Sequence, residues 1–134
     1  MRVFLDTNVL ASAFAARGLC ADLFEVVLLE HELVTGVMVA AELRRSLRAK
    51  LKLPASHCDD LLAFLRQAAS TFVRTSSPVS ARAEAGDAAV LGEALRGRAE
   101  IFLTGDAALQ RLIEIDLMKI LSPRNFWVRL HAGT

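Results

Sequence analysis

The sequence predicts an α/β domain in which a mainly parallel sheet of five strands lies between two layers of helices. Short apolar runs alternate along the chain with longer amphipathic segments, and most of the short runs are rich in Val, Ile, Phe or Thr, which favours strands. A crossover between two parallel strands needs a dozen or more residues and is usually a helix. The alternation therefore predicts parallel pairing with helices on both faces.

Each element follows from a local pattern. The expected strands are VFL (3–5), ELVT (32–35), TFVRT (71–75), IFLT (101–104) and the weaker LMKIL (117–121). Apolar residues at helical spacing predict helices at 8–16, 20–30, 37–51, 56–69, 87–97 and 107–115. A last helix is expected after Ser122, because Pro123 suits a first helical turn. The Ser-rich stretch 76–80 predicts a loop.

Composition limits the class of protein. The chain has 134 residues, 54% of them hydrophobic, which fits a single domain over 1–134 with a substantial core. Its net charge of +1 excludes the bulk positive field of a histone-like nucleic-acid binder. Cys20 and Cys58 lie far apart, which indicates reduced thiols rather than a disulfide scaffold. With no apolar stretch long enough to cross a bilayer, we expect a cytoplasmic protein that does not bind membranes.

Four acidic residues stand where a parallel sheet presents its ligands. In open α/β sheets, ligands bind at the carboxyl ends of the strands. Asp6 follows the first expected strand, Asp106 follows the fourth, and Asp87 opens the helix after the third. Glu42 lies about one and a half turns into the helix after the second strand. We therefore expect the four carboxylates to converge at one edge of the sheet.

Each acid also has a structural explanation. Asp6, Asp87 and Asp106 stand at helix starts, where a cap stabilises by about 0.5–2 kcal/mol. Glu42 could pair with Arg45 three residues later. Capping does not predict that every connection on one side of the sheet delivers an acid, often beside Gly or Ala that lets a ligand approach. The combination favours a shared site.

Carboxylates crowded together repel each other, and a cation among them removes the conflict. Hard oxygen ligands favour one or two Mg²⁺ or Mn²⁺ ions, and the lack of clustered His or Cys argues against zinc. His31, His57 and His131 are isolated and fit surface or packing positions. Such a metal centre can lower the pKa of water and neutralise charge on a phosphoryl transition state. The pattern therefore predicts phosphodiester hydrolysis.

The sequence resembles the PIN-domain ribonucleases, and more narrowly the toxin components of VapBC-like toxin–antitoxin pairs. The segments that carry the resemblance are LDTNVL, AAEL, GDAAVLGEAL, FLTGDAAL and the closing LSPRNF, in the order of the family. The resemblance implies a three-layer PIN-like fold and a metal-dependent endoribonuclease. It implies catalytic and metal-binding roles for Asp6, Glu42, Asp87 and Asp106, with support from Asn8 and Thr104.

One departure from the family concerns the third acid. Relatives often carry further Asp residues just before it, whereas this chain has Glu84, Ala85 and Gly86 there. Glu84 can replace one of them and Gly86 cannot, which bears on a second metal ion.

The resemblance also implies partners: an RNA substrate, a cognate antitoxin and a second copy of the chain in a homodimer. Leu23, Phe24, Val27 and Leu28 of helix 20–30 are a candidate wall of the antitoxin groove, with ordinary core packing as the alternative. The densest basic stretch follows Glu42, and it could grip RNA phosphates or form a solvated helix face. Its candidate RNA-binding residues are Arg44, Arg45 and Arg48, and it continues to Lys50 and Lys52.

Two alternatives stay open. The first is a non-catalytic binding or regulatory module on the same scaffold. The second is a phosphatase of the haloacid-dehalogenase kind with Asp6 as its nucleophile, although such enzymes carry a second Asp where this chain has Asn8. In the nuclease interpretation, a buried strand ends on Asp6 so that rigid β-structure holds a metal-binding carboxylate. Thr7 and Asn8 would then cap the next helix and hold that carboxylate.

Overall fold

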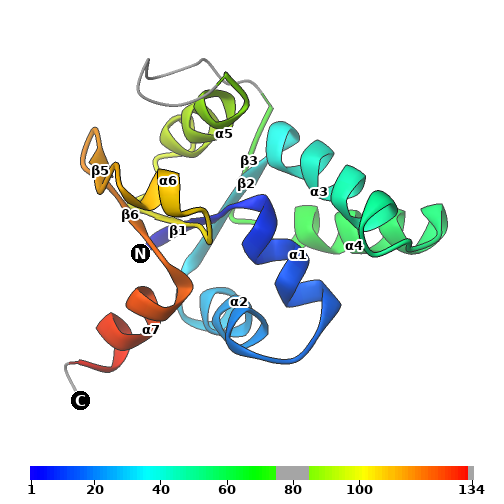
Figure 1. Cartoon of the computed structure of the whole chain (residues 1–134), viewed down its shortest axis with the longest axis horizontal. Coiled ribbons are helices and arrows are strands. Elements are labelled where there is room, and N and C mark those ends of the chain that lie inside the picture. Colours follow the sequence, from blue (N-terminus) through cyan, green and yellow to red (C-terminus); the bar gives the residue numbers. More distant parts are fainter. Residues whose placement is uncertain (75–84, 133–134) are drawn as a thin grey trace.

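The computed structural model describes residues 1–74 and 85–132 (Figure 1). Its sheet has the strand order β3-β2-β1-β4-β6-β5, and all neighbours pair in parallel except β5 with β6. The mainly parallel sheet between helices confirms the predicted class. The strands are β1 (Arg2–Leu5), β2 (Glu32–Gly36), β3 (Thr71–Val73), β4 (Ile101–Leu103), β5 (Glu114–Ile115) and β6 (Met118–Leu121).

The helices follow the predicted ranges closely, because long amphipathic segments carry a strong periodic signal. One of them, α7, starts as predicted: Ser122 is its N-cap, accepts from the Asn125 N–H, and precedes Pro123. The helices are α1 (Thr7–Ala15), α2 (Leu19–Glu30), α3 (Val37–Ala49), α4 (Ala55–Ala68), α5 (Ala85–Arg96), α6 (Ala107–Gln110) and α7 (Pro123–His131).

The expectation of five strands with a helix over 107–115 is wrong in detail. α6 ends at Gln110, and only Glu114–Ile115 of the remaining segment form the short strand β5, which pairs antiparallel with β6. Ile113, Asp116 and Leu117 have positive φ values of 66°, 47° and 72°, so the chain turns sharply before and after β5. Apolar residues at 112, 113 and 115 fit a short helix as well as a strand, which explains the error.

Two further expectations concern residues that lie partly or wholly outside the described ranges. The third strand ends at Val73 rather than at residue 75, and Thr75 lies outside the described residues. The predicted loop 76–80 and Glu84 also lie outside them.

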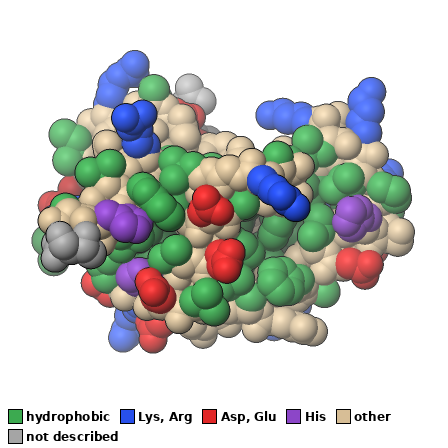
Figure 2. All heavy atoms as spheres, turned by 90° about the horizontal axis from the view of Figure 1, so that it is seen from below, with side chains coloured by type: hydrophobic (Ala, Val, Ile, Leu, Met, Phe, Trp, Pro, Cys, Tyr) green, Lys and Arg blue, Asp and Glu red, His purple; other side chains and the backbone are tan. Residues whose placement is uncertain are grey.

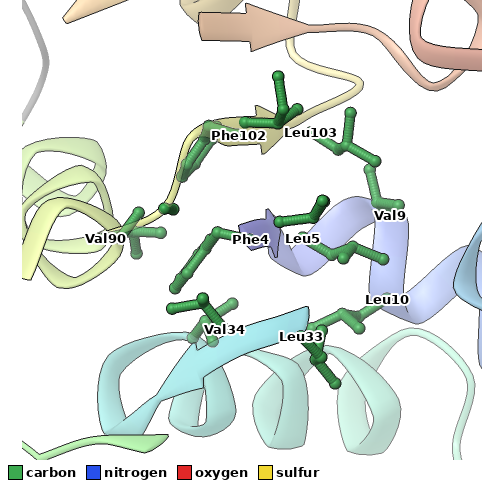
Figure 3. Close-up of a cluster of buried hydrophobic side chains, with 14 of the residues drawn as sticks. Phe4, Leu5, Val9, Leu10, Leu33, Val34, Val90, Phe102 and Leu103 are labelled. Atoms are coloured by element: carbon green, nitrogen blue, oxygen red, sulfur yellow. The ribbon is translucent and has the colours of Figure 1, made fainter. Parts of the chain in front are cut away.

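The core lies on both faces of the central strands. Phe4 of β1 stacks on Phe102 of β4 with ring centroids 5.3 Å apart, on the side of the sheet that Val90 of α5 covers (Figure 3). Leu5 and Leu103 point to the opposite face, toward α1, because neighbouring residues of a strand alternate in direction. The strands that end at the candidate site are therefore buried on both sides.

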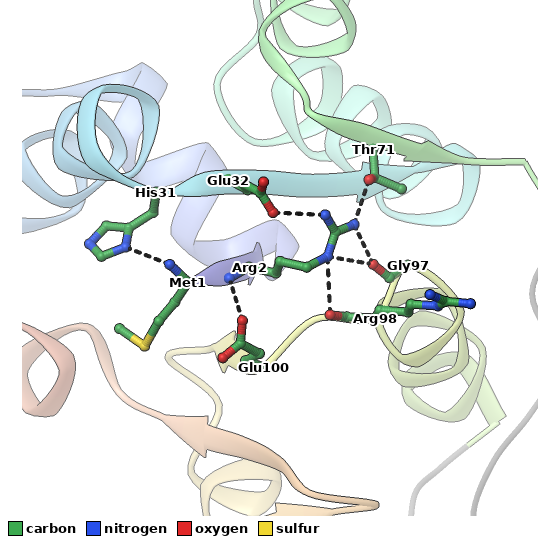
Figure 4. Close-up of polar contacts among 8 residues, drawn as sticks. All are labelled: Met1, Arg2, His31, Glu32, Thr71, Gly97, Arg98 and Glu100. Carbon is green, nitrogen blue, oxygen red and sulfur yellow. Dashed lines mark hydrogen bonds and ion pairs between the residues drawn. The ribbon is translucent and has the colours of Figure 1, made fainter.

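Arg2 joins four elements at the other end of the sheet (Figure 4). Its guanidinium donates to the carbonyls of Gly97 and Arg98, to Glu32 of β2 and to the Thr71 hydroxyl of β3. These contacts fix where β1, β2 and β3 begin relative to the turn that follows α5. The site at the opposite ends of the strands is thus built on a braced sheet.

The predicted antitoxin wall on α2 is core. Leu23 and Val27 are fully buried, Phe24 is 8% exposed, and Leu28 packs against the same cluster. Ordinary packing, the alternative explanation, therefore accounts for these side chains.

Within the described ranges, every helix is too short or too polar to cross a membrane.

Candidate metal-dependent nuclease site

Four acids from four different connections line one cavity of about 390 Å³. Asp6 follows β1, Glu42 lies on α3, Asp87 lies in the first turn of α5, and Asp106 follows β4. Their convergence follows from the parallel sheet, because the carboxyl ends of its strands share an edge. The remaining lining residues are Thr7, Asn8, Arg45, Ser46, Ala49 and Lys50.

Asp6 is held by three donors. Its Oδ1 accepts from the Thr7 N–H at 2.8 Å, so Asp6 is the N-cap of α1. Its Oδ2 accepts from the hydroxyl of Thr104 at 2.8 Å and from the amide of Asn8 at 3.2 Å. Asp6 can therefore cap α1 and also belong to the acidic site, because one of its oxygens caps the helix while the carboxylate borders the cavity.

The environment of Asp6 opposes its negative charge. Asp6 is 8% exposed, and burial raises the pKa of its carboxyl above the ordinary value of 3.8. Hydrogen bonds from Thr104 and Thr7 lower this pKa, while the charges of Glu42 and Asp87 raise it. A cation beside Asp6 would relieve both the desolvation and the repulsion.

Asn8 and Thr104, the two residues for which a supporting role is predicted, both hydrogen-bond to Asp6. Asn8 Oδ1 accepts from the Gly105 N–H at 2.8 Å, which orients its amide nitrogen toward Asp6. The buried Thr104 hydroxyl accepts from the Asp106 N–H at 3.0 Å while it donates to Asp6. Two polar side chains thus connect the ends of β1 and β4.

Thr7 has a different role from the predicted one. Rather than capping α1, its hydroxyl donates to Oε2 of Glu42 at 2.9 Å and so holds the acid of α3 beside the end of β1. Asp106, like Asp6, is both a lining residue and a cap, because its Oδ1 accepts from the N–H groups of Ala108 and Leu109. Only the folded structure could separate these roles.

The basic side chains that follow Glu42 point in two directions. Arg45 and Lys50 line the cavity. Arg44 instead forms an ion pair with Asp59 of α4, and Arg48 donates to the Leu53 carbonyl at 3.3 Å. Of the three candidate arginines, Arg45 is therefore the one that the structure brings to the acids.

A second cavity, of about 240 Å³, lies between α1 and α3 and shares Asn8, Ser46 and Lys50 with the first. Its other walls are the small side chains of α1 and Leu51, and the small residues are Ala11, Ser12 and Ala15. The two cavities are therefore neighbours, with Lys50 in the lining of both.

The donor set fits an oxygen-preferring divalent cation, because the cavity is lined by four carboxylates and no His or Cys. As the side chains stand, no three His, Cys, Asp or Glu residues within 1–74 and 85–132 form a group that could hold an ion. The acids surround a common space without closing on one point. Ion binding would therefore need some of these carboxylates to move closer together.

The sequence did not predict a role for Glu93 of α5. It is fully buried, and its carboxylate accepts from the N–H groups of Met38 at 2.7 Å and Val39 at 3.1 Å. Burial raises its pKa, the two hydrogen bonds lower it, and the charge of Glu42 raises it. In the sequence, Glu93 looks like one more polar residue of an amphipathic helix, and the sole signal was its place in the GDAAVLGEAL segment.

The chain has a three-layer α/β/α fold of the PIN-like kind. It is similar to the crystal structure of VapBC2 from Rickettsia felis bound to a DNA fragment from its promoter, with a TM-score of 0.65. The match covers 91% of this chain and 98% of that chain, at 14% sequence identity. At this identity the likeness concerns the fold. No family model matches the sequence, and no curated protein does.

Proposed function

We propose that the chain is a metal-dependent endoribonuclease, acting as the toxin of a toxin–antitoxin pair in the cytoplasm, with residues 1–134 as one nuclease domain. The observation that carries this proposal is the convergence of Asp6, Glu42, Asp87 and Asp106 on one cavity at the carboxyl edge of the sheet. The fold likeness to VapBC2 and the resemblance of the four acidic segments to PIN-domain ribonucleases support it.

In this proposal the four acids hold one or two Mg²⁺ or Mn²⁺ ions. A bound ion would neutralise the scissile phosphate and activate a water molecule for attack. The chain itself orients the ligands: Thr104 and Asn8 hold Asp6, and Thr7 holds Glu42. Asp6 is the fixed point of the site because it sits at the end of a strand buried on both faces.

Arg45 and Lys50 are proposed to bind the RNA backbone. They border the same cavity as the acids, so a strand whose scissile phosphate lies at the acids can place a neighbouring phosphate on these cations. The second cavity, between α1 and α3, offers space for the adjoining nucleotide on the Lys50 side.

A cognate antitoxin and a homodimer complete the proposal. The crystal structure of VapBC2 holds a DNA fragment from its promoter, and an antitoxin bound to this chain would cover apolar surface. Figure 2 shows hydrophobic side chains between acidic ones on the face seen from below in Figure 1. Large exposed hydrophobic residues of α2, α4 and α7 are candidates for such contacts, namely Leu29, Phe64 and Val128.

The test is cleavage of a single-stranded RNA with a fluorophore and a quencher, by protein purified without a partner. We expect cleavage with Mn²⁺ or Mg²⁺, none with EDTA, and a loss of at least about 100-fold in Asp6→Asn. Binding of RNA without metal-dependent cleavage would instead favour the non-catalytic module. A phosphorylated Asp6 trapped with a phosphomonoester would favour the phosphatase.

A further inference from the structure

Glu93 is a buried carboxylate that the proposed chemistry does not use. Its side chain is completely inaccessible, and both oxygens are occupied by N–H groups of Met38 and Val39, more than fifty positions away in sequence. A buried charge is costly unless it is well hydrogen-bonded, so a chain tolerates it where it performs a task.

Glu93 caps the N-terminus of α3. The first four N–H groups of a helix have no partner within it, and a side chain of the N-cap residue normally satisfies one or two. In α3 the N-cap is Gly36, which has no side chain to offer. Glu93 supplies the missing acceptors from another helix, and its negative charge also favours the positive end of the α3 dipole.

The contact requires glycine on the other side. A Cβ at Gly36 would lie 2.3 Å from Cδ of Glu93 and 2.6 Å from the carbonyl oxygen of Val73. The backbone at Gly36 is extended, with φ of −173°, so its conformation alone does not demand glycine. Close approach of the Glu93 carboxylate and of the Val73 carbonyl does.

The two elements that Glu93 joins each carry a site acid. Glu42 follows Val39 by three residues on α3, and Asp87 precedes Glu93 by six residues on α5. We propose that Glu93 is a positioning residue that, by capping α3 from α5, sets the separation of Glu42 and Asp87 across the cavity. Its link to catalysis rests on the proposed nuclease function.

This role differs from ordinary helix capping. A local cap stabilises one helix, whereas this bond connects two helices that reach the cavity from different connections of the sheet. Loss of the bond therefore shifts two proposed metal ligands relative to each other without removing either. The charge of Glu42 contributes to the raised pKa of Glu93, which is consistent with the nearness of the two carboxyls.

The experiment compares Glu93→Ala, Glu93→Gln and Gly36→Ala with wild type in the full chain. We expect Glu93→Ala to weaken Mn²⁺ binding by calorimetry, and to lower kcat, by about 10-fold or more, the range typical of residues that orient metal ligands. KM for RNA should change much less. Glu93→Gln keeps one oxygen acceptor and should recover part of the loss, while Gly36→Ala should reproduce the Glu93→Ala defect from the opposite side of the contact.

A matched control separates positioning from general instability. Phe126→Leu removes volume from a fully buried site on α7, far from the contact of α3 with α5 in the fold, and should lower the unfolding temperature without changing Mn²⁺ affinity or kcat. Combining Gly36→Ala with Glu93→Ala should cost less than the sum of the two single changes, because both break the same contact between Gly36 and Glu93. Wild-type Mn²⁺ affinity and kcat in Glu93→Ala would overturn the inference, as would full additivity.

Amide hydrogen exchange gives a readout that does not depend on the nuclease proposal. The N–H groups of Met38 and Val39 should exchange slowly in wild type and faster in Glu93→Ala and Gly36→Ala, relative to the amides of α7. If wild type binds no Mn²⁺ and cuts no RNA, the nuclease proposal fails, and accelerated exchange at these two amides still supports the contact. Unchanged exchange there would overturn the positioning role even if the enzyme is active. Should Glu93→Ala not fold, Glu93→Gln and Gly36→Ala carry the same comparison.

Discussion

The hydroxyl of Thr104 donates to Oδ2 of Asp6 at 2.8 Å and joins the ends of two paired parallel strands, although the residues lie 98 positions apart. The same hydroxyl accepts from the Asp106 N–H. One threonine thus orients the innermost acid and the backbone of another. The site is organised by such bonds between strand ends.

Thr104→Val tests this bond with little change in shape. The variant leaves Oδ2 of Asp6 with fewer donors and the Asp106 N–H without its acceptor, which should cost about 1–3 kcal/mol of unfolding free energy. We expect RNA cleavage to fall by about 10- to 100-fold, as for other residues that orient metal ligands. Thr104→Ser retains the hydroxyl and is the control. Equal cleavage by Thr104→Val and wild type would show that the bond is dispensable for the site.

Asp6→Asn should change how stability depends on pH. Burial raises the pKa of Asp6 in the folded state above 3.8, so the folded protein binds this proton more tightly than the unfolded chain. The contribution of Asp6 to stability is therefore fully present below the unfolded pKa and is lost as pH rises through the folded pKa. Asparagine does not titrate.

The measurement is urea unfolding of both proteins in EDTA over a series of pH values. The unfolding free energy of Asp6→Asn minus that of wild type should increase from about pH 4 upward and level off above the folded pKa. Adding Mn²⁺ at neutral pH should stabilise wild type more than the variant, because the ion binds the folded state. A difference that stays constant with pH would contradict a raised pKa.

Arg45→Ala and Arg44→Ala separate the two faces of α3. Arg45 borders the cavity, whereas Arg44 pairs with Asp59. In Ca²⁺, which is expected to allow binding but little cleavage, Arg45→Ala should weaken RNA binding and reduce the slope of log affinity against log salt by about 1. Arg44→Ala should leave both nearly unchanged. The measurement is fluorescence anisotropy of a short single-stranded RNA, and equal effects of the two variants would contradict the assignment of Arg45 to the backbone.

Arg2→Lys tests the brace at the far end of the sheet. The guanidinium reaches two carbonyls, a carboxylate and a hydroxyl at once, a geometry that an ammonium group does not reproduce (Figure 4). We expect a loss of about 1–3 kcal/mol in unfolding free energy, because several acceptors lose their donors. Cleavage per folded molecule should be unchanged. Glu32→Gln, which affects only the exposed ion pair of Arg2, should cost less than about 1 kcal/mol.

Much of the candidate site could be predicted because its signals are local. Asp6 ends a strand that is apolar on both faces, and Asp106 follows another, so the geometry of a parallel sheet leads directly to their common edge. Asn8 and Thr104 were assigned a supporting role from the resemblance, and the structure bonds both to Asp6. For the two acids, residue order and sheet geometry are enough, whereas the supporting residues came from the resemblance.

Other parts of the candidate site depend on how deeply a side chain is buried and on which neighbour it faces, and hydrophobic periodicity does not predict either. α5 is buried nearly all round, so an acid in its pattern can be surface or core, and the burial of Glu93 follows only from its contact with α3. The same holds for Arg44 and Arg45, adjacent residues that a helix turns toward different neighbours. The turns around β5 place Ile113 and Leu117 at positive φ, which their residue types do not favour.

The sequence by itself determined the layered parallel sheet and the edge at which the acids gather, because hydrophobic period and crossover length permit few topologies. Tertiary structure alone decided which basic side chains face the acids and which buried carboxylate joins α3 to α5. These choices depend on contacts between segments far apart in the chain, and their free energy comes from burial and hydrogen bonding in three dimensions.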